Sequence, residues 1–148
     1  MAKLDPETEN NIEELIRAAE AGNAAAQCNL AWSYDEGEGV EVDHEKAFYW
    51  YTKAADAGDT FALCNLGVRY QLGKGVEKNE KMAMQLFRKS AKLNEPSAYY
   101  ALYICYINGR GVRKNRQLAL KYLHKSAELG YPKARKILKK LEETQNEQ

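Results

Sequence analysis

Long apolar segments and proline are scarce in this chain, and each shortage excludes a class of protein. No apolar run approaches the roughly 20 residues that span a bilayer, which excludes membrane insertion as a helix. Only three prolines occur in 148 residues, and 29% of the side chains are charged, which excludes collagen-like and low-complexity chains. The composition therefore favours one soluble, helix-rich domain that is large enough to fold around an ordinary core.

Cysteine and histidine are too rare and too widely spaced for a metal, redox or hydrolytic site. Cys28, Cys64 and Cys105 form no C-x-x-C motif, and their odd number leaves one outside any bridge. His44-Glu45 begins an H-E-x-x-H motif, but a phenylalanine occupies the fifth position, so the zinc motif is incomplete. No Ser-x-x-Lys motif or phosphate-binding loop is present. We therefore predict that the chain is not an enzyme and holds no metal or cofactor.

The beginning of the chain and its cysteines indicate a location. The first residues are charged and contain no apolar signal core, which argues against export. The unmatched number of cysteines is typical of a reducing compartment. We expect a cytoplasmic protein.

The near-neutral net charge of +1 conceals a strong polarity along the chain. Residues 1–74 contain 14 acidic and 6 basic side chains, whereas residues 75–148 contain 7 acidic and 16 basic ones. The two halves therefore carry net charges of −8 and +9. Such polarity steers charged partners and does not determine the fold.

A 36-residue repeat runs through the sequence without an insertion. Residues 37–40, 73–76 and 109–112 read G-E-G-V, G-K-G-V and G-R-G-V. The same offset aligns further residues of identical type: Tyr34, Tyr70 and Tyr106; Lys53, Lys89 and Lys125; Ala55, Ala91 and Ala127. The periodicity predicts three full repeats, at 23–58, 59–94 and 95–130.

Each repeat has the pattern of two helices joined by a glycine turn. Ala62, Leu66 and Tyr70 recur at helical spacing before the G-x-G turn, and a second helical stripe follows the turn. The first glycine suits the left-handed position that ends a helix. Asp43, Asn79 and Asn115 are predicted to be the N-caps of the second helices.

The two ends have the character of terminal caps. Residues 1–22 are predicted to hold one capping helix, with Asp5 as N-cap and Pro6 at the first helical position. Residues 131–148 are predicted to hold a second, lysine-rich capping helix that frays from about Thr144. Solenoids need such polar terminal helices because an unpaired repeat exposes apolar surface.

The repeat pattern resembles one known family. It reads A-x-x-x-L-[AG]-x-x-Y-x-x-G-x-G-V-x-x-[DN]-x-x-x-A-x-x-x-x-x-K-[AS]-A and is similar to the Sel-one-like (SLR) repeat, a relative of the tetratricopeptide repeat. This resemblance covers nearly the whole chain. It implies an all-α fold, a right-handed α-α superhelix (solenoid) of 36-residue helix-turn-helix repeats, and a scaffold or adaptor that binds other proteins.

The first helix of each repeat has two apolar sides, and one of them is a candidate binding surface. Residues 64 and 66 lie about 200° apart on a helix, so only one side packs against the second helix of the same repeat. In a tetratricopeptide-like stack the other side lines a concave groove. The resemblance thus places in the groove Trp32, Asp35, Phe61, Cys64, Val68, Gln71, Tyr100, Ile104 and Ile107, with Lys133, Lys136 and Lys140 at its basic end.

We expect this groove to bind a peptide or protein segment, with Trp32 as the principal anchor because tryptophan is enriched at interface anchors. Three alternatives stay open. The apolar stripe is core if strong curvature buries it between neighbouring first helices. In the second alternative, the basic C-terminal end binds nucleic acid or another polyanion, although the pI of about 7.6 disfavours nucleic acid. In the third, opposite charges drive head-to-tail self-association.

Overall fold

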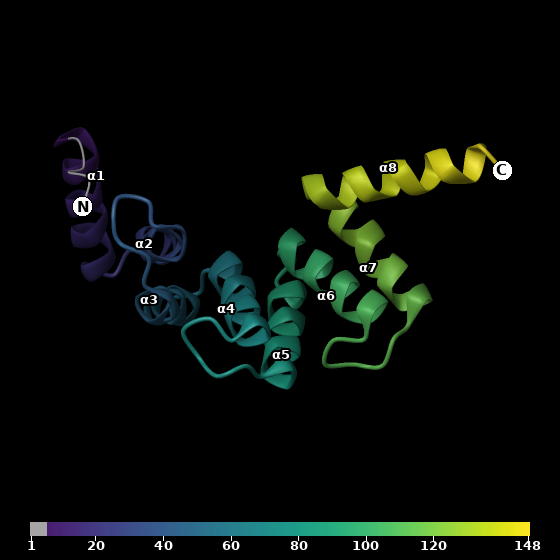
Figure 1. The fold of residues 1–148 in the computed structure, drawn as a ribbon, viewed down its shortest axis with the longest axis horizontal. Coiled ribbons are helices and arrows are strands. Elements are labelled where there is room, and N and C mark those ends of the chain that lie inside the picture. Colours follow the sequence, from purple (N-terminus) through teal and green to yellow (C-terminus); the bar gives the residue numbers. More distant parts are fainter. Residues whose placement is uncertain (1–5) are drawn as a thin grey trace. The chain divides into compact units, whose positions relative to one another are not determined.

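The computed structural model describes residues 6–148, which form eight α-helices (Figure 1). Within this range there is no β-strand. The helices are α1 (Pro6–Glu20), α2 (Ala24–Glu36), α3 (His44–Asp56), α4 (Thr60–Leu72), α5 (Glu80–Lys92), α6 (Pro96–Asn108), α7 (Arg116–Glu128) and α8 (Pro132–Asn146). None of these helices is long and apolar enough to cross a membrane.

The helix boundaries reproduce the sequence period. Helices α2, α4 and α6 begin 36 residues apart, as do α3, α5 and α7, and each of the six contains 13 residues. Each pair of helices that flanks a G-x-G turn is one repeat, as the periodicity predicts. The repeated hairpin pattern is therefore confirmed.

The caps form where short polar residues and glycines interrupt the helical pattern. Asp43 and Asn115 accept hydrogen bonds from the backbone N–H groups of Lys46 and Leu118, both at 3.0 Å, and so satisfy donors that the helix leaves open. Gly73 has φ +66° and ends α4 with a bond from its N–H to the Arg69 carbonyl. Both kinds of cap agree with the sequence prediction.

The second glycine of two of the turns has a role that the periodicity does not predict. A Cβ on Gly75 would lie 2.0 Å from the carbonyl oxygen of His44, in the first turn of α3. A Cβ on Gly111 would lie 2.9 Å from the carbonyl oxygen of Glu80, and its N–H donates to Glu80 Oε2 at 3.1 Å. These glycines thus allow a turn to approach the second helix of the preceding repeat.

The ends of the chain differ slightly from the prediction. Helix α8 does not end near Thr144 but continues to Asn146, and the Thr144 hydroxyl donates to the Lys140 carbonyl at 2.9 Å. Asp5, the predicted N-cap of the first helix, lies outside the described residues.

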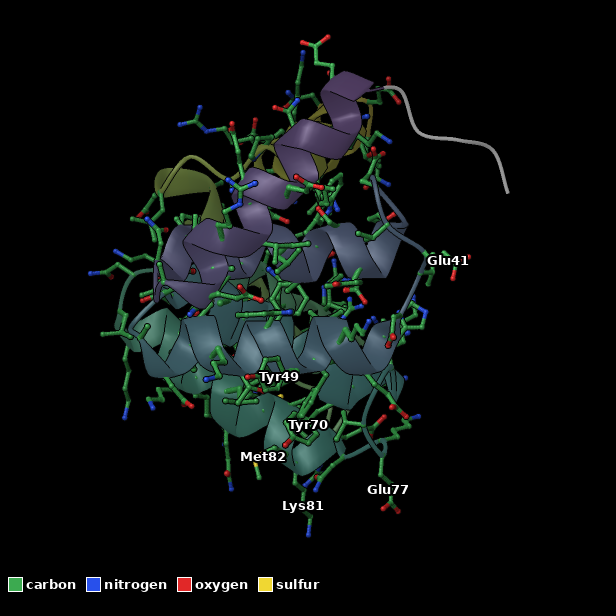
Figure 2. All side chains as sticks on the ribbon, turned by 90° about the vertical axis from the view of Figure 1, so that its left-hand side faces the viewer. Glu41, Tyr49, Tyr70, Glu77, Lys81 and Met82 are labelled. Carbon is green, nitrogen blue, oxygen red and sulfur yellow. The ribbon has the colours of Figure 1, made fainter. Side chains whose placement is uncertain are left out.

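The chain divides into two compact units, and the first is Met1–Asn79. In this unit, here called unit 1, each helix from α1 to α4 packs against the next (Figure 1). One core cluster is formed by Ala19, Ala26 and Leu30. The loop residues Glu41 and Glu77, one repeat apart, are exposed and point away from the helices (Figure 2).

The second compact unit, unit 2, is Glu80–Gln148. Helix α6 packs against α5 and α7, and α7 packs against α8. Leu123, Ala127 and Ala134 form a core cluster that the half-buried Tyr100 and Tyr103 cover. The only buried residue of α8 is Ala134, as expected of a helix that closes a core on one side and meets solvent on the other.

Replacement of Leu66 by alanine tests the predicted core stripe. Leu66 is 8% exposed, and its truncation should lower the free energy of unfolding by about 2–5 kcal/mol because it leaves a cavity. The control is Leu72→Ala on the same helix, where the side chain is 50% exposed and the expected loss is under about 1 kcal/mol. Urea unfolding followed by far-UV circular dichroism measures both. Equal losses would contradict the assignment of the core face.

Candidate functional site

The first helices of unit 1 expose large apolar side chains on one face. Trp32 on α2 and Phe61 on α4 are each 49% exposed, and Leu72 at the end of α4 is 50% exposed. Glu36 continues this exposed face at the end of α2. Half-exposed aromatic side chains on neighbouring elements are typical of protein-interaction surfaces.

Two of the predicted groove residues in unit 1 are buried. Cys64 is 5% exposed, and Asp35 is 9% exposed. Val68 and Gln71 are half-buried. The exposed face of the first helices runs through Trp32 and Phe61, and it lies about 60° around each helix from the buried side that carries Asp35 and Cys64.

A buried ion pair joins α2 to α4. Arg69 Nη1 donates to Asp35 Oδ2 at 2.5 Å, and the Asp35 carboxylate is only 4% accessible. The other carboxylate oxygen, Asp35 Oδ1, lies 2.9 Å from Nδ1 of His44, in the first turn of α3. The cluster of Asp35, His44 and Arg69 therefore ties three consecutive helices together beneath the exposed face.

Tyr51 completes the environment of this ion pair. It is 2% exposed, and the Arg69 guanidinium lies 6.0 Å from the centre of its ring. Burial raises the pKa of the Tyr51 hydroxyl well above its usual range, and the nearby Asp35 charge adds to the effect. Tyr51 therefore stays neutral and acts as packing for the charged pair.

Sequence reasoning missed the roles of Arg69 and His44. Arg69 occupies a repeat position that holds a serine and a cysteine in the other repeats, Ser33 and Cys105, and both of these are buried. A long charged side chain at a position of small buried residues implies a partner, because an unpaired buried charge is costly. That signal points to Asp35, whose counterparts Gln71 and Ile107 carry no charge.

The predicted residues of unit 2 form a more covered surface. Tyr100, Ile104 and Ile107 on α6 are all half-buried. The Tyr100 ring lies 5.8 Å from that of Tyr103 and 5.2 Å from that of Tyr131, between ring centres. Burial, followed by the proximity of Tyr103, raises the pKa of the Tyr100 hydroxyl above its usual value. These rings form an aromatic cluster at the base of α8.

The predicted basic residues are all at the surface. Lys133, Lys136 and Lys140 are exposed on α8. Their side chains therefore face solvent. Solvated lysines of this kind are available to an anionic partner, and they equally serve as the polar outer surface of a terminal helix.

Among the side chains that the structure describes, no three histidine, cysteine or acidic groups cluster in a way suited to metal binding. All three cysteines are buried, and none is joined in a disulfide within the described chain. Buried thiols of this kind act as small apolar side chains.

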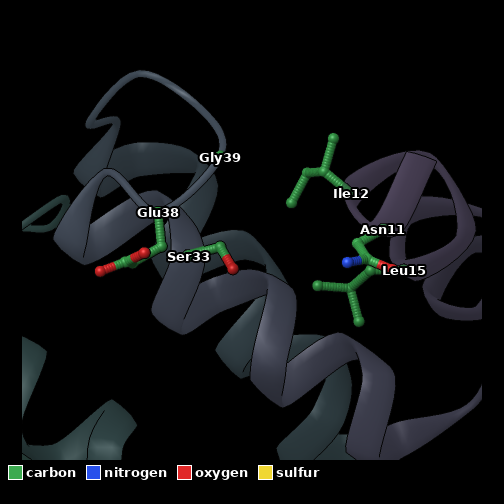
Figure 3. A pocket seen from close by; sticks show the side chains of 6 residues that line it. All are labelled: Asn11, Ile12, Leu15, Ser33, Glu38 and Gly39. Carbon is green, nitrogen blue, oxygen red and sulfur yellow. The ribbon is translucent and has the colours of Figure 1, made fainter. Parts of the chain in front are cut away.

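Unit 1 also has a small hollow between α1 and α2. Ile12 and Leu15 of α1 point toward Ser33 of α2, and Glu38 and Gly39 lie at the edge (Figure 3). The hollow measures about 190 Å³, which is below the usual size of ligand pockets. We assign it no ligand.

Comparison with known proteins identifies relatives by both sequence and structure. The sequence matches the family described as Sel1 repeat over residues 24–59, 60–95 and 96–131. A Sel1 repeat protein from Oxalobacter formigenes is 35% identical, with a TM-score of 0.79 over 86% of this chain and 52% of that one. A protective antigen of uropathogenic Escherichia coli with an SLR fold is 33% identical, with a TM-score of 0.78 over 86% of this chain and 27% of that one.

A third solved structure is similar in fold. Cysteine rich protein B of Helicobacter pylori is 24% identical, with a TM-score of 0.67 over 92% of this chain and 98% of that one. No protein with a curated description matches the sequence. The chain spans about half the length of the Oxalobacter protein and about a quarter of the Escherichia protein. These matches confirm the resemblance seen in the sequence and the fold class, an all-α solenoid of 36-residue repeats.

Proposed function

This chain belongs to the Sel1 repeat family, whose members generally act as protein-interaction scaffolds, and we propose that it binds a segment of a partner protein on the exposed faces of its first helices. The observation that carries the proposal is the set of half-exposed large apolar side chains on the first helices of unit 1, which are Trp32, Phe61 and Leu72. Because the family fold is typically a non-catalytic scaffold, we propose no enzymatic activity. We also propose a cytoplasmic location, for which buried thiols are suited.

The buried ion pair under this face supports the proposal. Asp35 and Arg69 hold α2 and α4 together, so the apolar side chains that these helices expose are held in a defined arrangement. A surface that is ordered before binding loses less conformational entropy when a partner binds. Aromatic side chains on such a surface are the usual anchors of affinity.

Charge indicates which segment suits this surface. Unit 1 contains 15 acidic and 7 basic side chains, and Glu36 lies on the exposed face beside Trp32. A complementary segment is therefore amphipathic, with an apolar side and basic flanks. In unit 2 we keep Tyr100, Ile104 and Ile107 as contact residues of the same proposal. Gln71, Val68 and the buried Cys64 border the contact surface of unit 1.

Affinity capture tests the proposal through Trp32. The wild-type chain, Trp32→Ala and Tyr49→Ala are compared as baits for cell extract, with bound proteins identified by mass spectrometry. Tyr49 is a matched control because it is a 50% exposed aromatic residue of unit 1 on a second helix, α3. We expect at least one partner to bind Tyr49→Ala as it binds the wild-type chain. The same partner should bind Trp32→Ala at least about tenfold more weakly.

The contrary result is equally clear. If Trp32→Ala and Phe61→Ala retain the wild-type fold and every partner at wild-type affinity, the first-helix surface is not the binding site.

The exposed lysines of α8 favour a second candidate function, the binding of nucleic acid or another polyanion. A binding constant that falls steeply between low and physiological salt, and that Lys136→Ala reduces, would support it. The opposite net charges along the chain likewise motivate head-to-tail self-association. Sedimentation at low and high salt measures that directly.

A further inference from the structure

Unit 2 contains a basic and aromatic pocket on the side of α6 that faces away from the predicted groove. It is lined by Arg88, Ala91 and Lys92 of α5, Tyr99 and Leu102 of α6, and Tyr122 of α7, and it measures about 290 Å³. We call it the Arg88 pocket. Tyr99 and Ile104 are five residues apart on α6, about 140° around the helix, so the pocket and the predicted groove residues occupy different faces.

The pocket has an apolar floor and a cationic rim. Leu102 and Ala91 are 1% and 5% exposed and form the deepest part. Arg88 and Lys92, one helical turn apart on α5, are exposed. A ligand must therefore place an apolar group inward and its negative charge at the mouth.

Aromatic contacts hold the walls in place. The Tyr99 and Tyr122 rings are 6.1 Å apart between centres, and Tyr122 stacks on Tyr106 at 5.6 Å. Arg88 Nη2 donates to the Tyr106 hydroxyl at 3.1 Å, which fixes the guanidinium beside the rings. Burial raises the pKa of the Tyr122 hydroxyl above its usual value, with a smaller contribution from Tyr106. The walls are therefore neutral aromatic surfaces beside two cations.

The repeats themselves indicate that the lining residues are not required by the fold. Position by position, the other repeats carry other residues, most of them of different chemistry: Arg88 is replaced by Thr52 and His124, Lys92 by Asp56 and Glu128, Tyr99 by Gln27 and Leu63, and Tyr122 by Trp50 and Leu86. Those repeats form the same helices with the same bounds relative to the repeat. Four positions that the repeat pattern leaves variable thus meet in one pocket.

We propose that the Arg88 pocket binds an acidic segment of a partner protein through one aromatic anchor residue that is flanked by glutamate or aspartate. The size of the pocket lies just below that of small-molecule sites, so it suits one side chain rather than a nucleotide or cofactor. Tyrosine walls favour an aromatic anchor. The exposed cations then pair with the flanking carboxylates, and the excess of 15 basic over 6 acidic side chains in unit 2 attracts them.

This site is independent of the proposed function. The first-helix surface of unit 1 suits basic flanks, whereas the Arg88 pocket selects acidic ones. Variants at Trp32 test the former without altering the latter, so the failure of one proposal leaves the other standing.

The test uses the full chain labelled with ¹⁵N and a blocked pentapeptide probe, acetyl-Gly-Glu-Phe-Glu-Gly-amide. Titration followed by two-dimensional NMR should shift amide signals of residues that line the pocket, in a saturable way. Two control peptides replace both glutamates by glutamine or the phenylalanine by alanine. We expect each to bind about fivefold more weakly, because one loses two exposed charge pairs and the other loses the anchor.

Residues from the other repeats supply the protein variants. Arg88→Thr, Lys92→Asp and Tyr99→Leu introduce the residues that the chain itself carries at the equivalent positions Thr52, Asp56 and Leu63, so the helices should be retained, as far-UV circular dichroism will verify. We expect Arg88→Thr and Lys92→Asp each to lower the affinity for the probe about threefold to tenfold. Lys81→Asp, at the opposite end of α5, is the control with the same change of charge as Lys92→Asp outside the pocket, and it should leave binding nearly unchanged.

Three results would overturn the proposal. The first is an equal loss of probe affinity with Lys81→Asp, which would mean general attraction to a basic unit. The second is equal affinity for the alanine peptide, which would remove the aromatic anchor and leave a polyanion site. The third is the absence of saturable shifts near Tyr99 and Tyr122 with a folded wild-type chain.

Discussion

Gly75→Ala is expected to lower the free energy of unfolding by about 4 kcal/mol or more. Two causes combine. Gly75 has φ +75°, a conformation that strains a residue with a Cβ. The new Cβ would also lie 2.0 Å from the carbonyl oxygen of His44 and 3.0 Å from the amide nitrogen of Glu45. Because both are backbone atoms at the start of α3, the turn itself must move.

Gly58→Ala separates these two causes. Gly58 has φ +94°, but no heavy atom lies within 4 Å of the position its Cβ would take. We expect the free energy of unfolding of this control to fall by only about 1–2 kcal/mol, from backbone strain alone. Urea unfolding monitored by circular dichroism measures both variants. Similar losses for Gly58→Ala and Gly75→Ala would show that the close approach to α3 contributes nothing.

Asp35→Ile is expected to destabilise unit 1 by about 3 kcal/mol. The substitution removes the carboxylate that pairs with Arg69, whose side chain is only 11% accessible. Arg69 Nε already has no hydrogen-bond partner, so the variant would leave the buried guanidinium without compensation for its charge. Hydrogen exchange of the amides in α2 and α4 should report the loss locally.

The double variant Asp35→Ile with Arg69→Cys tests whether the charge is the cause. Each substitution introduces the residue that the third repeat carries at the equivalent position, Ile107 for Asp35 and Cys105 for Arg69. Replacement of a buried ion pair by apolar residues is often neutral, so most of the lost stability should return. A double variant as unstable as the sum of its single variants would mean that Asp35 and Arg69 act independently. If it is stable but binds partners weakly, the pair serves the exposed surface above it.

The helical architecture could be predicted because it depends on local rules. Helix bounds follow from the 36-residue period, the glycine that ends each first helix and caps such as Asp43 and Asn115. These features act within one or two turns of the chain, so each can be recognised without knowledge of its neighbours in space. The exposure of the Trp32 side chain agrees with the predicted apolar stripe of the first helix for the same reason.

The candidate surface was predicted less well because the rotation of a helix depends on the helices around it. Helical spacing groups Asp35 and Cys64 with Trp32 and Phe61, yet the first two are buried and the last two are exposed. Angles of about 60° around the helix separate these positions, and packing of neighbouring helices divides them. The Arg88 pocket was not predicted either, since its lining comes from three helices.

The sequence by itself determined the number and bounds of the helices, the repeat, the family and the polarity of charge. Each of these features depends on residues that lie close together in the chain or recur at a constant interval. Only the tertiary structure decided which polar side chains are buried, why Gly75 and Gly111 must be glycine, and that Asp35 meets Arg69 and His44. The physical reason is that burial and pairing arise between residues about 10 to 35 positions apart, whose meeting depends on how packed helices approach one another.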